Sequence, residues 1–217
     1  MSGAVKDGRL LGTSGDNPYF VDMARLGPES VIYCGGLGHQ IEFERALVRE
    51  LGAVINCFDP TNESATYLRQ KKPEGLRFSR IGLSGTDGSI YFTVKKERSK
   101  YYNSVEIREG HSAGVGEEVF EVRRVGTIMK KMSHRVIDLF KIDIEGAEYA
   151  VLDDMISCGI LPNQIALEWH YSYIGAGDRV RGRDITKSYV DKLIGFGYKV
   201  IYSTRSDTEM TFARTDA

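Results

Sequence analysis

The fold is decided by the stretch Leu139-Phe140-Lys141-Ile142-Asp143-Ile144-Glu145-Gly146-Ala147-Glu148. Its apolar first half predicts a buried strand over 136–144, and its glycine turn and acids predict the start of a helix. Ligands of α/β sheets bind outside the carboxyl ends of the strands. The end of this strand is therefore the expected place of a functional site.

Repeated strand–helix units surround this stretch. The predicted strands are 31–34, 54–58, 76–83, 136–144 and 164–171, and the predicted helices are 41–51, 62–71, 148–158 and 185–196. Such alternation predicts an α/β fold with a mostly parallel sheet and right-handed crossovers. The last two strands, 199–203 and 209–213, are too close for a crossover, so we expect a hairpin that makes one edge strand antiparallel.

The domain organisation follows from length and local composition. A chain of 217 residues suits one α/β domain, which we expect over 19–217. The polar, glycine-rich residues 1–18 are predicted to be a loose leader, with a short helix over 19–26. Residues 85–125 combine turn residues with extended runs and are too few for a core of their own, so they predict an antiparallel embellishment.

Composition excludes several function classes. The chain is 41% hydrophobic and carries a net charge of -1, so bulk charge does not favour nucleic-acid binding. No apolar run approaches the roughly 20 residues of a membrane span, and no signal-peptide core is present. We expect a cytoplasmic protein with no nucleic-acid or membrane partner. The cysteines Cys34, Cys57 and Cys158 show no metal-ligand spacing and are expected to be reduced.

Two other strand ends carry candidate binding residues. At Gly36-Leu37-Gly38, between a strand and a helix, glycines allow a ligand close to the backbone amides. Asp59-Pro60 follows the next strand, where an acid accepts ribose hydroxyls. A tight strand–helix turn and a helix-entry turn are the alternatives. Because the third glycine of a dinucleotide fingerprint is missing, a mononucleoside-like cofactor is favoured.

The opening stretch contains several charged residues with different expected roles. Lys141 and Asp143 are two apart on one strand and share a face, and a buried lysine needs an acidic partner such as Asp143. Glu145 and Glu148 lie at a helix start, where the dipole stabilises negative charge. For Glu148 that role is favoured over catalysis, whereas Glu145 stays open between the two.

Glu168 and His170 are two apart at the end of the neighbouring strand. Asp143 and His170 are therefore expected to border one cleft. A histidine of ordinary pKa takes a proton from a hydroxyl at neutral pH, which makes His170 the candidate base; a hydrogen-bonded structural histidine is the alternative. Asp143, Glu168 and His170 are suitable metal ligands in type, but nothing in the sequence fixes their geometry, so no metal is predicted. An arginine-rich loop at 172–184 is expected to cover the site or to be solvated.

The segment FKIDIEGAEYAVL (140–152) resembles the signature of FkbM-type S-adenosylmethionine-dependent methyltransferases, and LEWH (167–170) is similar to the segment that follows it in that family. With the glycine turn and the acid–proline pair, the resemblance covers roughly 31–213. It implies a Rossmann-like class I methyltransferase fold, a seven-stranded mostly parallel sheet with an antiparallel last strand, and S-adenosylmethionine as cofactor.

The resemblance also implies roles for single residues. Gly36 and Gly38 pass under the methionine part of the cofactor, Asp59 binds the ribose, the 80–83 region with Gly82 lies beside the adenine, and Asp143 faces the sulfonium. The sequence departs from the family at the first motif. Cys34 or Tyr33 stands where relatives carry an acid, and Gln40 replaces a later glycine.

The sequence therefore predicts an S-adenosylmethionine-dependent O-methyltransferase that acts on a hydroxyl of a sugar, glycan or secondary metabolite. Catalysis comes mainly from positioning, with His170 as the first candidate for the base and Asp143 and Glu145 as further catalytic candidates. The departure at the first motif motivates one alternative, a catalytically silent cofactor-binding module. A nicotinamide-dependent enzyme is a second, disfavoured by the incomplete glycine fingerprint.

Overall fold

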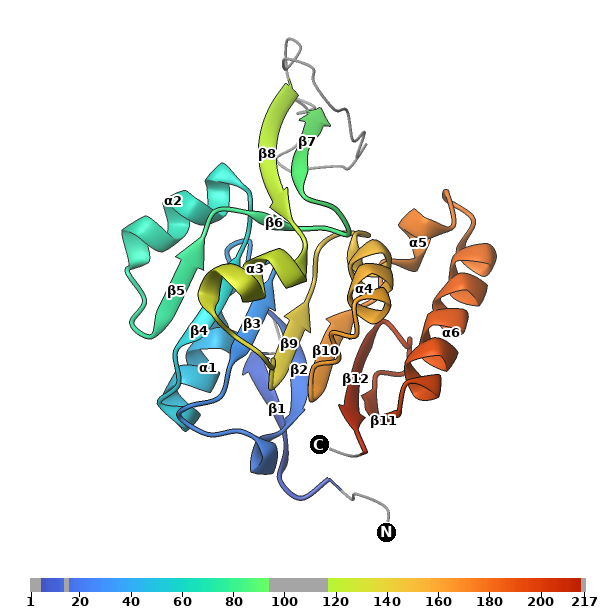
Figure 1. Cartoon of the computed structure of the whole chain (residues 1–217), viewed down its shortest axis with the longest axis horizontal. Coiled ribbons are helices and arrows are strands. Elements are labelled where there is room, and N and C mark those ends of the chain that lie inside the picture. Colours follow the sequence, from blue (N-terminus) through green and yellow to red (C-terminus); the bar gives the residue numbers. More distant parts are fainter. Residues whose placement is uncertain (1–4, 14–15, 94–116, 216–217) are drawn as a thin grey trace.

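A seven-stranded sheet forms the centre of the molecule, in the order β11-β12-β10-β9-β3-β4-β5 (Figure 1). The computed structural model describes residues 5–13, 16–93 and 117–215. The strands are β3 (Ile32–Gly35), β4 (Ile55–Phe58), β5 (Leu76–Ser79), β9 (Leu139–Ile142), β10 (Gln164–Glu168), β11 (Tyr198–Ser203) and β12 (Glu209–Arg214).

The pairing of the strands confirms a mostly parallel sheet. The five strands from β5 to β10 in the sheet order are parallel, and β12 is antiparallel to both of its neighbours. The last strand is thus antiparallel, as expected. The prediction that this antiparallel strand lies at the edge of the sheet is wrong. Strand β12 inserts between β10 and β11, so the edge strand is β11, which runs in the same direction as β10.

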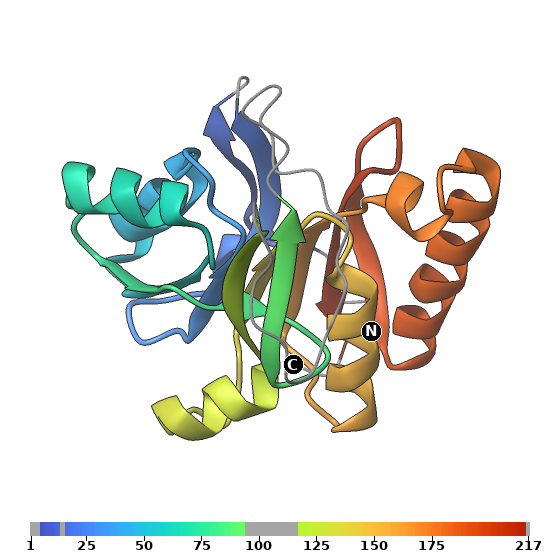
Figure 2. The same cartoon turned by 90° about the horizontal axis from the view of Figure 1, so that it is seen from above.

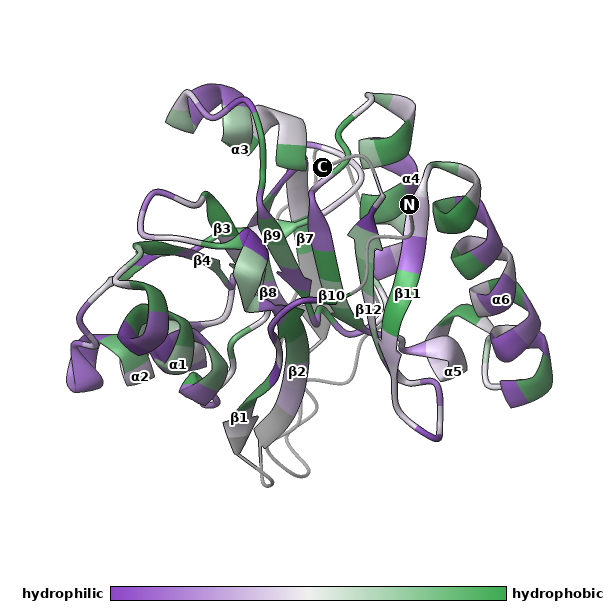
Figure 3. Cartoon of the chain, turned by 90° about the horizontal axis from the view of Figure 1, so that it is seen from below, coloured by the Kyte–Doolittle hydropathy of each residue, from purple (hydrophilic) through white to green (hydrophobic). Residues whose placement is uncertain are grey.

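Helices and a hairpin cover the two faces of the sheet (Figure 2). The helices are α1 (Glu42–Leu51), α2 (Asn62–Lys71), α3 (Val125–Met132), α4 (Glu148–Ser157), α5 (Tyr171–Ile174) and α6 (Arg179–Gly195). Apolar residues of α3, α4 and α6 pack into one core, and those of α1, α2 and the N-terminal hairpin into another. Hydrophilic colour marks α2 and stretches of α6 at opposite ends of the molecule (Figure 3). None of the described helices is both long and apolar enough to cross a membrane.

The N-terminal segment forms a hairpin of β1 (Gly8–Thr13) and β2 (Asp16–Asp22), so the prediction of a loose leader is wrong for the described residues. The helix predicted over 19–26 is confirmed only in its second half, where a short 3-10 helix spans Met23–Arg25. Tyr19 and Val21 alternate into the core, which is the period of a strand. The Gln164 side chain fixes the hairpin to β10, since its oxygen accepts from Asp22 N and its amide donates to Asp22 O. The polar, glycine-rich composition had concealed this alternation.

A second sheet of order β6-β8-β7 contains β6 (Gly82–Leu83), β7 (Gly88–Thr93) and β8 (Glu117–Arg123). The pair β7–β8 is antiparallel, which agrees with the predicted embellishment over 85–125, whereas residues 94–116 of that segment lie outside the described residues. The strand predicted over 76–83 is divided between the two sheets. A turn in which Ile81 N donates to Ser79 O separates its halves.

The arginine-rich segment is helical, so the loop predicted over 172–184 is wrong. Helix α6 begins at Arg179, six residues earlier than expected. The Asp178 side chain caps it by accepting from Val180 N and Arg181 N, and capping of this kind fixes a helix start. Arg183 lies over the Tyr171 ring at 4.6 Å.

The cysteines are all free. Cys34 and Cys57 are buried register partners on the neighbouring strands β3 and β4. Cys158 differs, because it is exposed at the end of α4.

Candidate active site

Charged side chains gather where β9 and β10 end. We call Asp143, Glu145, Glu148, Glu168 and His170 the acid–histidine cluster. Asp143 follows β9, Glu168 ends β10, and His170 directly precedes α5. One ligand atom each from Asp143, Glu168 and His170 lie within 4.8 Å of one another. The structure therefore brings together the two strand ends that sequence reasoning placed at one cleft.

His170 is surrounded by carboxylates. Its Nδ1 donates to Glu148 at 2.8 Å, and its Nε2 lies 3.5 Å from Glu145 and 3.9 Å from Asp143. Burial alone lowers the pKa of His170, but the hydrogen bond to Glu148 and the surrounding negative charges outweigh burial and raise the pKa to about 9. At neutral pH the ring is protonated and has no lone pair to take a proton. A protonated His170 does not fit the expected role of this residue as the base.

Glu148 organises the turn between β9 and α4. It is fully buried, and its Oε1 accepts from Ile144 N at 3.0 Å and Gly146 N at 3.2 Å as well as from His170. Its position in the first turn of α4 agrees with the expected helix-start charge. The Glu145 side chain is instead exposed, and its carboxylate accepts a hydrogen bond from the Tyr173 hydroxyl. The Glu145 backbone is in the left-handed region, with φ 56°. Glu148 therefore fixes the orientation of His170.

Glu168 has the titration behaviour of a base. Burial is the main cause that raises its pKa to about 7; the charge of Asp143 adds to the shift and His170 opposes it. A carboxylate with a pKa near the working pH suits general base catalysis. Sequence reasoning considered Glu168 only as a metal ligand. The signal in the sequence that could have identified Glu168 was its position as a second acid at the end of a neighbouring strand.

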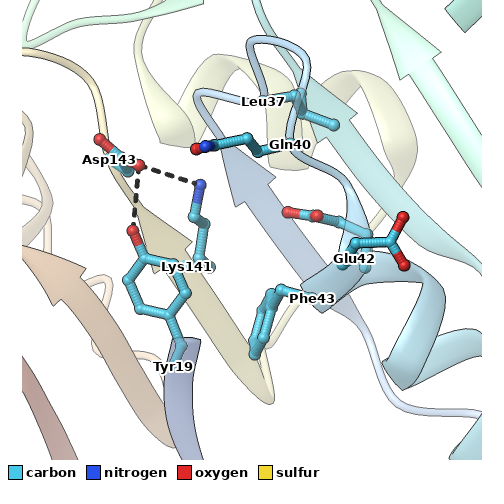
Figure 4. Close-up of a pocket in the computed structure, with 8 residues that line it drawn as sticks. Tyr19, Leu37, Gln40, Glu42, Phe43, Lys141 and Asp143 are labelled. Carbon is cyan, nitrogen blue, oxygen red and sulfur yellow. Dashed lines mark hydrogen bonds and ion pairs between the residues drawn. The ribbon is translucent and has the colours of Figure 1, made fainter. Parts of the chain in front are cut away.

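Lys141 is the buried partner of Asp143, as predicted. Its ammonium lies 3.6 Å from Asp143 Oδ2, donates to the carbonyls of Gly35 and Gly36, and stands over the Tyr19 ring at 5.1 Å. The Tyr19 hydroxyl donates to the same Asp143 oxygen at 3.0 Å (Figure 4). Asp143 is thus held by a cation and a hydroxyl, and Tyr19 is a site residue that sequence reasoning had placed in a helix.

The glycine turn and Asp59 bond each other. Asp59 Oδ2 accepts from Leu37 N at 3.0 Å and from Gly38 N at 3.1 Å. Its Oδ1 accepts from the amide and hydroxyl of Thr61, whose side chain caps α2. The Asp59 carboxylate, expected to bind a ribose, is therefore bonded to the glycine-turn amides that were expected to face a ligand. Its bonds to Thr61 agree with the alternative of a helix-entry turn.

Pro60 and Gly82 are neighbours at the edge of the second sheet. A Cβ on Gly82 would lie 3.3 Å from Pro60 Cγ. The Pro60 carbonyl accepts from Arg80 Nε at 3.1 Å. The two segments that the family resemblance links to the ribose and the adenine therefore lie side by side.

Gly36 and Gly38 serve different purposes. Gly36 has φ 73°, and an added Cβ would lie 1.5 Å from the Asp143 carbonyl oxygen; Gly38 has φ 54° and open space around it. We expect Gly38→Ala to cost about 1–2 kcal/mol of unfolding free energy, from backbone strain alone. Gly36→Ala should cost at least about 4 kcal/mol, because the β9 end must move. Urea unfolding measures both, and equal losses would contradict the close approach.

A pocket lies beside the cluster, between the hairpin, the glycine turn and the start of α1 (Figure 4). It is lined by Tyr19, Leu37, Gln40, Glu42, Phe43, Glu44, Lys141 and Asp143. Asp143 belongs to both the pocket and the cluster. A molecule bound in the pocket would thus reach the charged groups at the strand ends.

A mostly parallel seven-stranded sheet with helices is consistent with a methyltransferase-like α/β fold, and the charged site and the pocket lie at its carboxyl edge, where such sheets bind ligands. The sequence model of the Methyltransferase FkbM domain matches residues 20–198. The chain belongs to this family, which confirms the resemblance of the KIDIEGAE segment and supports its classification as a methyltransferase.

Two curated relatives carry a methyltransferase name. "Probable methyltransferase-like protein 24" of Homo sapiens is 24% identical over 146 residues, which cover 66% of this chain and 33% of the relative. The Rattus norvegicus protein of the same name is 24% identical over 147 residues, 66% of this chain and 34% of the relative. The matched part thus spans about a third of the length of these relatives.

Proposed function

We propose that the chain is an S-adenosylmethionine-dependent O-methyltransferase of the Rossmann-like class I fold, acting on a hydroxyl of a sugar, glycan or secondary metabolite. The observation that carries the proposal is the acid–histidine cluster at the ends of β9 and β10, next to the pocket under the glycine turn. Family membership supports the reaction class. The acceptor class, a cytoplasmic location and the absence of nucleic-acid and membrane partners stay predictions.

The pocket fits the proposed cofactor in its chemistry. Carboxylates and the Tyr19 and Phe43 rings line it, and both kinds of group attract a cation such as a sulfonium. When bound, S-adenosylmethionine supplies an electrophilic methyl group. Asp143, held by Lys141 and Tyr19, would face it from β9. The remaining cofactor contacts of this proposal are Gly36, Leu37, Gly38, Asp59, Pro60 and Gly82, with Asp59 exchanging its amide partners for ribose hydroxyls.

The acid–histidine cluster would handle the acceptor's proton. Glu168 takes the proton from the hydroxyl as the base, because its pKa of about 7 leaves it largely ionised in mildly alkaline solution. The protonated His170, oriented by Glu148, donates a hydrogen bond and offsets the nearby negative charge. Positioning of the hydroxyl by these groups supplies most of the rate enhancement.

Calorimetry and a methyl-transfer assay test the proposed function. We expect S-adenosylmethionine and S-adenosylhomocysteine to bind and NAD not to bind. Methyl transfer to a member of a broad hydroxyl panel should follow. Failure of both adenosyl ligands to bind at millimolar concentration would overturn the proposal, and binding of NAD alone would favour the nicotinamide enzyme. Binding without transfer across the panel would favour the silent module.

The cluster also contains ligand types of a divalent-cation site in Asp143, Glu168 and His170. Both nitrogens of the protonated His170 ring carry a hydrogen and act as hydrogen-bond donors, so the ring has no lone pair for a metal in that state. We therefore expect methyl transfer to be unchanged after dialysis against a chelator, measured with and without added Mg²⁺. Activity that is lost with the chelator and restored by Mg²⁺ would assign the three residues to a metal instead.

A further inference from the structure

Glu44 is a buried acid that the proposed reaction does not use. It lies in the first turn of α1 and is 1% exposed. Neither of its carboxylate oxygens has a hydrogen-bond partner within the described parts of the chain. The helix dipole accounts for a surface acid such as Glu42, which pairs with Arg45, but not for the burial of an unpartnered one. Burying a carboxylate is costly unless a cation or donor compensates it.

The protein compensates Glu44 only in part. Burial is the main cause that raises the pKa of Glu44, whereas the charge of Lys141, followed by the Glu44 backbone amide and the Cys34 thiol, works in the opposite direction. The Lys141 ammonium is already engaged by the carbonyls of Gly35 and Gly36 and by Asp143. Glu44 therefore keeps its capacity to bind a further cation.

The pocket that Glu44 lines suits a cation with an apolar attachment. Its acidic and basic lining consists of three carboxyl groups, those of Glu42, Glu44 and Asp143, and one ammonium, that of Lys141. The Tyr19 and Phe43 rings meet edge to face at 5.2 Å between centroids on the same side (Figure 4). Negative charge beside aromatic faces attracts organic cations.

The end of β3 carries no acid, so a carboxylate at this side of the pocket has to come from α1. That strand ends in Cys34 and Gly35 and offers no acid to the pocket. Glu44 lies against the Cys34 thiol, so its carboxylate stands close to the strand end from the helix side. A positive group bound at the glycine turn thus finds its carboxylate on the helix that follows.

We propose that Glu44 binds the α-ammonium group of the cofactor's methionine part and supplies from α1 the carboxylate that the end of β3 lacks. The assignment rests on the proposed use of S-adenosylmethionine. It makes Glu44 a cofactor-binding residue and predicts a specific dependence on the amino group, without any effect on the adenosine part.

Calorimetry with two ligands isolates this contact. The ligands are S-adenosylhomocysteine and its analogue without the α-amino group, titrated into the wild type, Glu44→Gln and Glu63→Gln. Glu63 provides the matched control, since it is also a first-turn acid, on α2, but does not line the pocket. The wild type and Glu63→Gln should prefer the amino ligand by about 10–100-fold, the usual range for a charge-assisted hydrogen bond. Glu44→Gln should lose this preference and bind the analogue as the wild type does.

The outcomes separate the assignment from the function it rests on. An unchanged preference in Glu44→Gln overturns the role of Glu44 alone. Equal affinity of the wild type for the two ligands does the same and needs no variant, which covers a Glu44→Gln protein that does not fold. No binding of either ligand by the wild type overturns the cofactor, and the assignment with it.

Discussion

Replacing Glu168 by glutamine should slow methyl transfer by about 10²–10⁴-fold, the usual contribution of a general base. Glutamine keeps the shape of the side chain but accepts no proton. In the wild type the rate should rise with pH through about 7, as Glu168 loses its proton, and fall above about 9, as His170 loses the proton that it donates. The variant should lack the acid limb and keep the alkaline one.

The measurement is a pH–rate profile at saturating cofactor. Glu209→Gln is the matched control, because Glu209 lies opposite Glu168 on β12 and its charge adds to the raised pKa of Glu168. That variant should keep the acid limb and move it to lower pH. An acid limb that is unchanged in Glu168→Gln would exclude Glu168 as the base.

Thermal melting separates this loss of rate from a loss of fold. The folded-state pKa of Glu168 is raised above its ordinary 4.5 to about 7, so the folded protein holds the proton more tightly than the unfolded chain. Stability from this group is present below pH 4.5 and is lost as the pH rises through 7. Glutamine carries no such loss, so the variant should melt at an equal or higher temperature than the wild type at pH 8.

The sequence predicted those parts of the fold that local signals determine. Helix α2 spans the predicted residues 62–71 after the Thr61 cap, and the strand–helix alternation predicted the parallel part of the sheet. The hairpin of 8–22 was missed, because its polar composition hides which side chains the sheet covers. The insertion of β12 beside β10 is a tertiary pairing that spacing in the sequence does not encode.

The site was predictable in position and less so in chemistry. The strand-end rule brought Asp143 near His170, and the same-face argument paired Lys141 with Asp143. The protonation of His170 depends on Glu148, which lies 22 positions earlier in the chain and appeared only as a helix-start charge. Such shifts arise from burial and from neighbours in space, so a residue type and its ordinary pKa do not reveal them.

Lys141→Met should destabilise the protein by about 3–5 kcal/mol, because removing one partner of a buried ion pair leaves uncompensated charge. The substitution takes the nearest cation from Asp143 and Glu44 and leaves the carbonyl of Gly36 without its donor. Lys199→Met is the control, an exposed lysine on β11 whose loss should change stability by less than about 0.5 kcal/mol.

Urea unfolding of a double variant shows which charge matters. Adding Asp143→Asn to Lys141→Met removes the negative charge that the lysine balanced, so the pair should be less destabilised than the sum of the two single variants. Additive losses would mean that Lys141 acts through its bonds to the glycine-turn carbonyls rather than through Asp143. In that case the lysine holds β3 against β9, and the position of Asp143 at the pocket depends on the glycine turn instead of on its own ion pair.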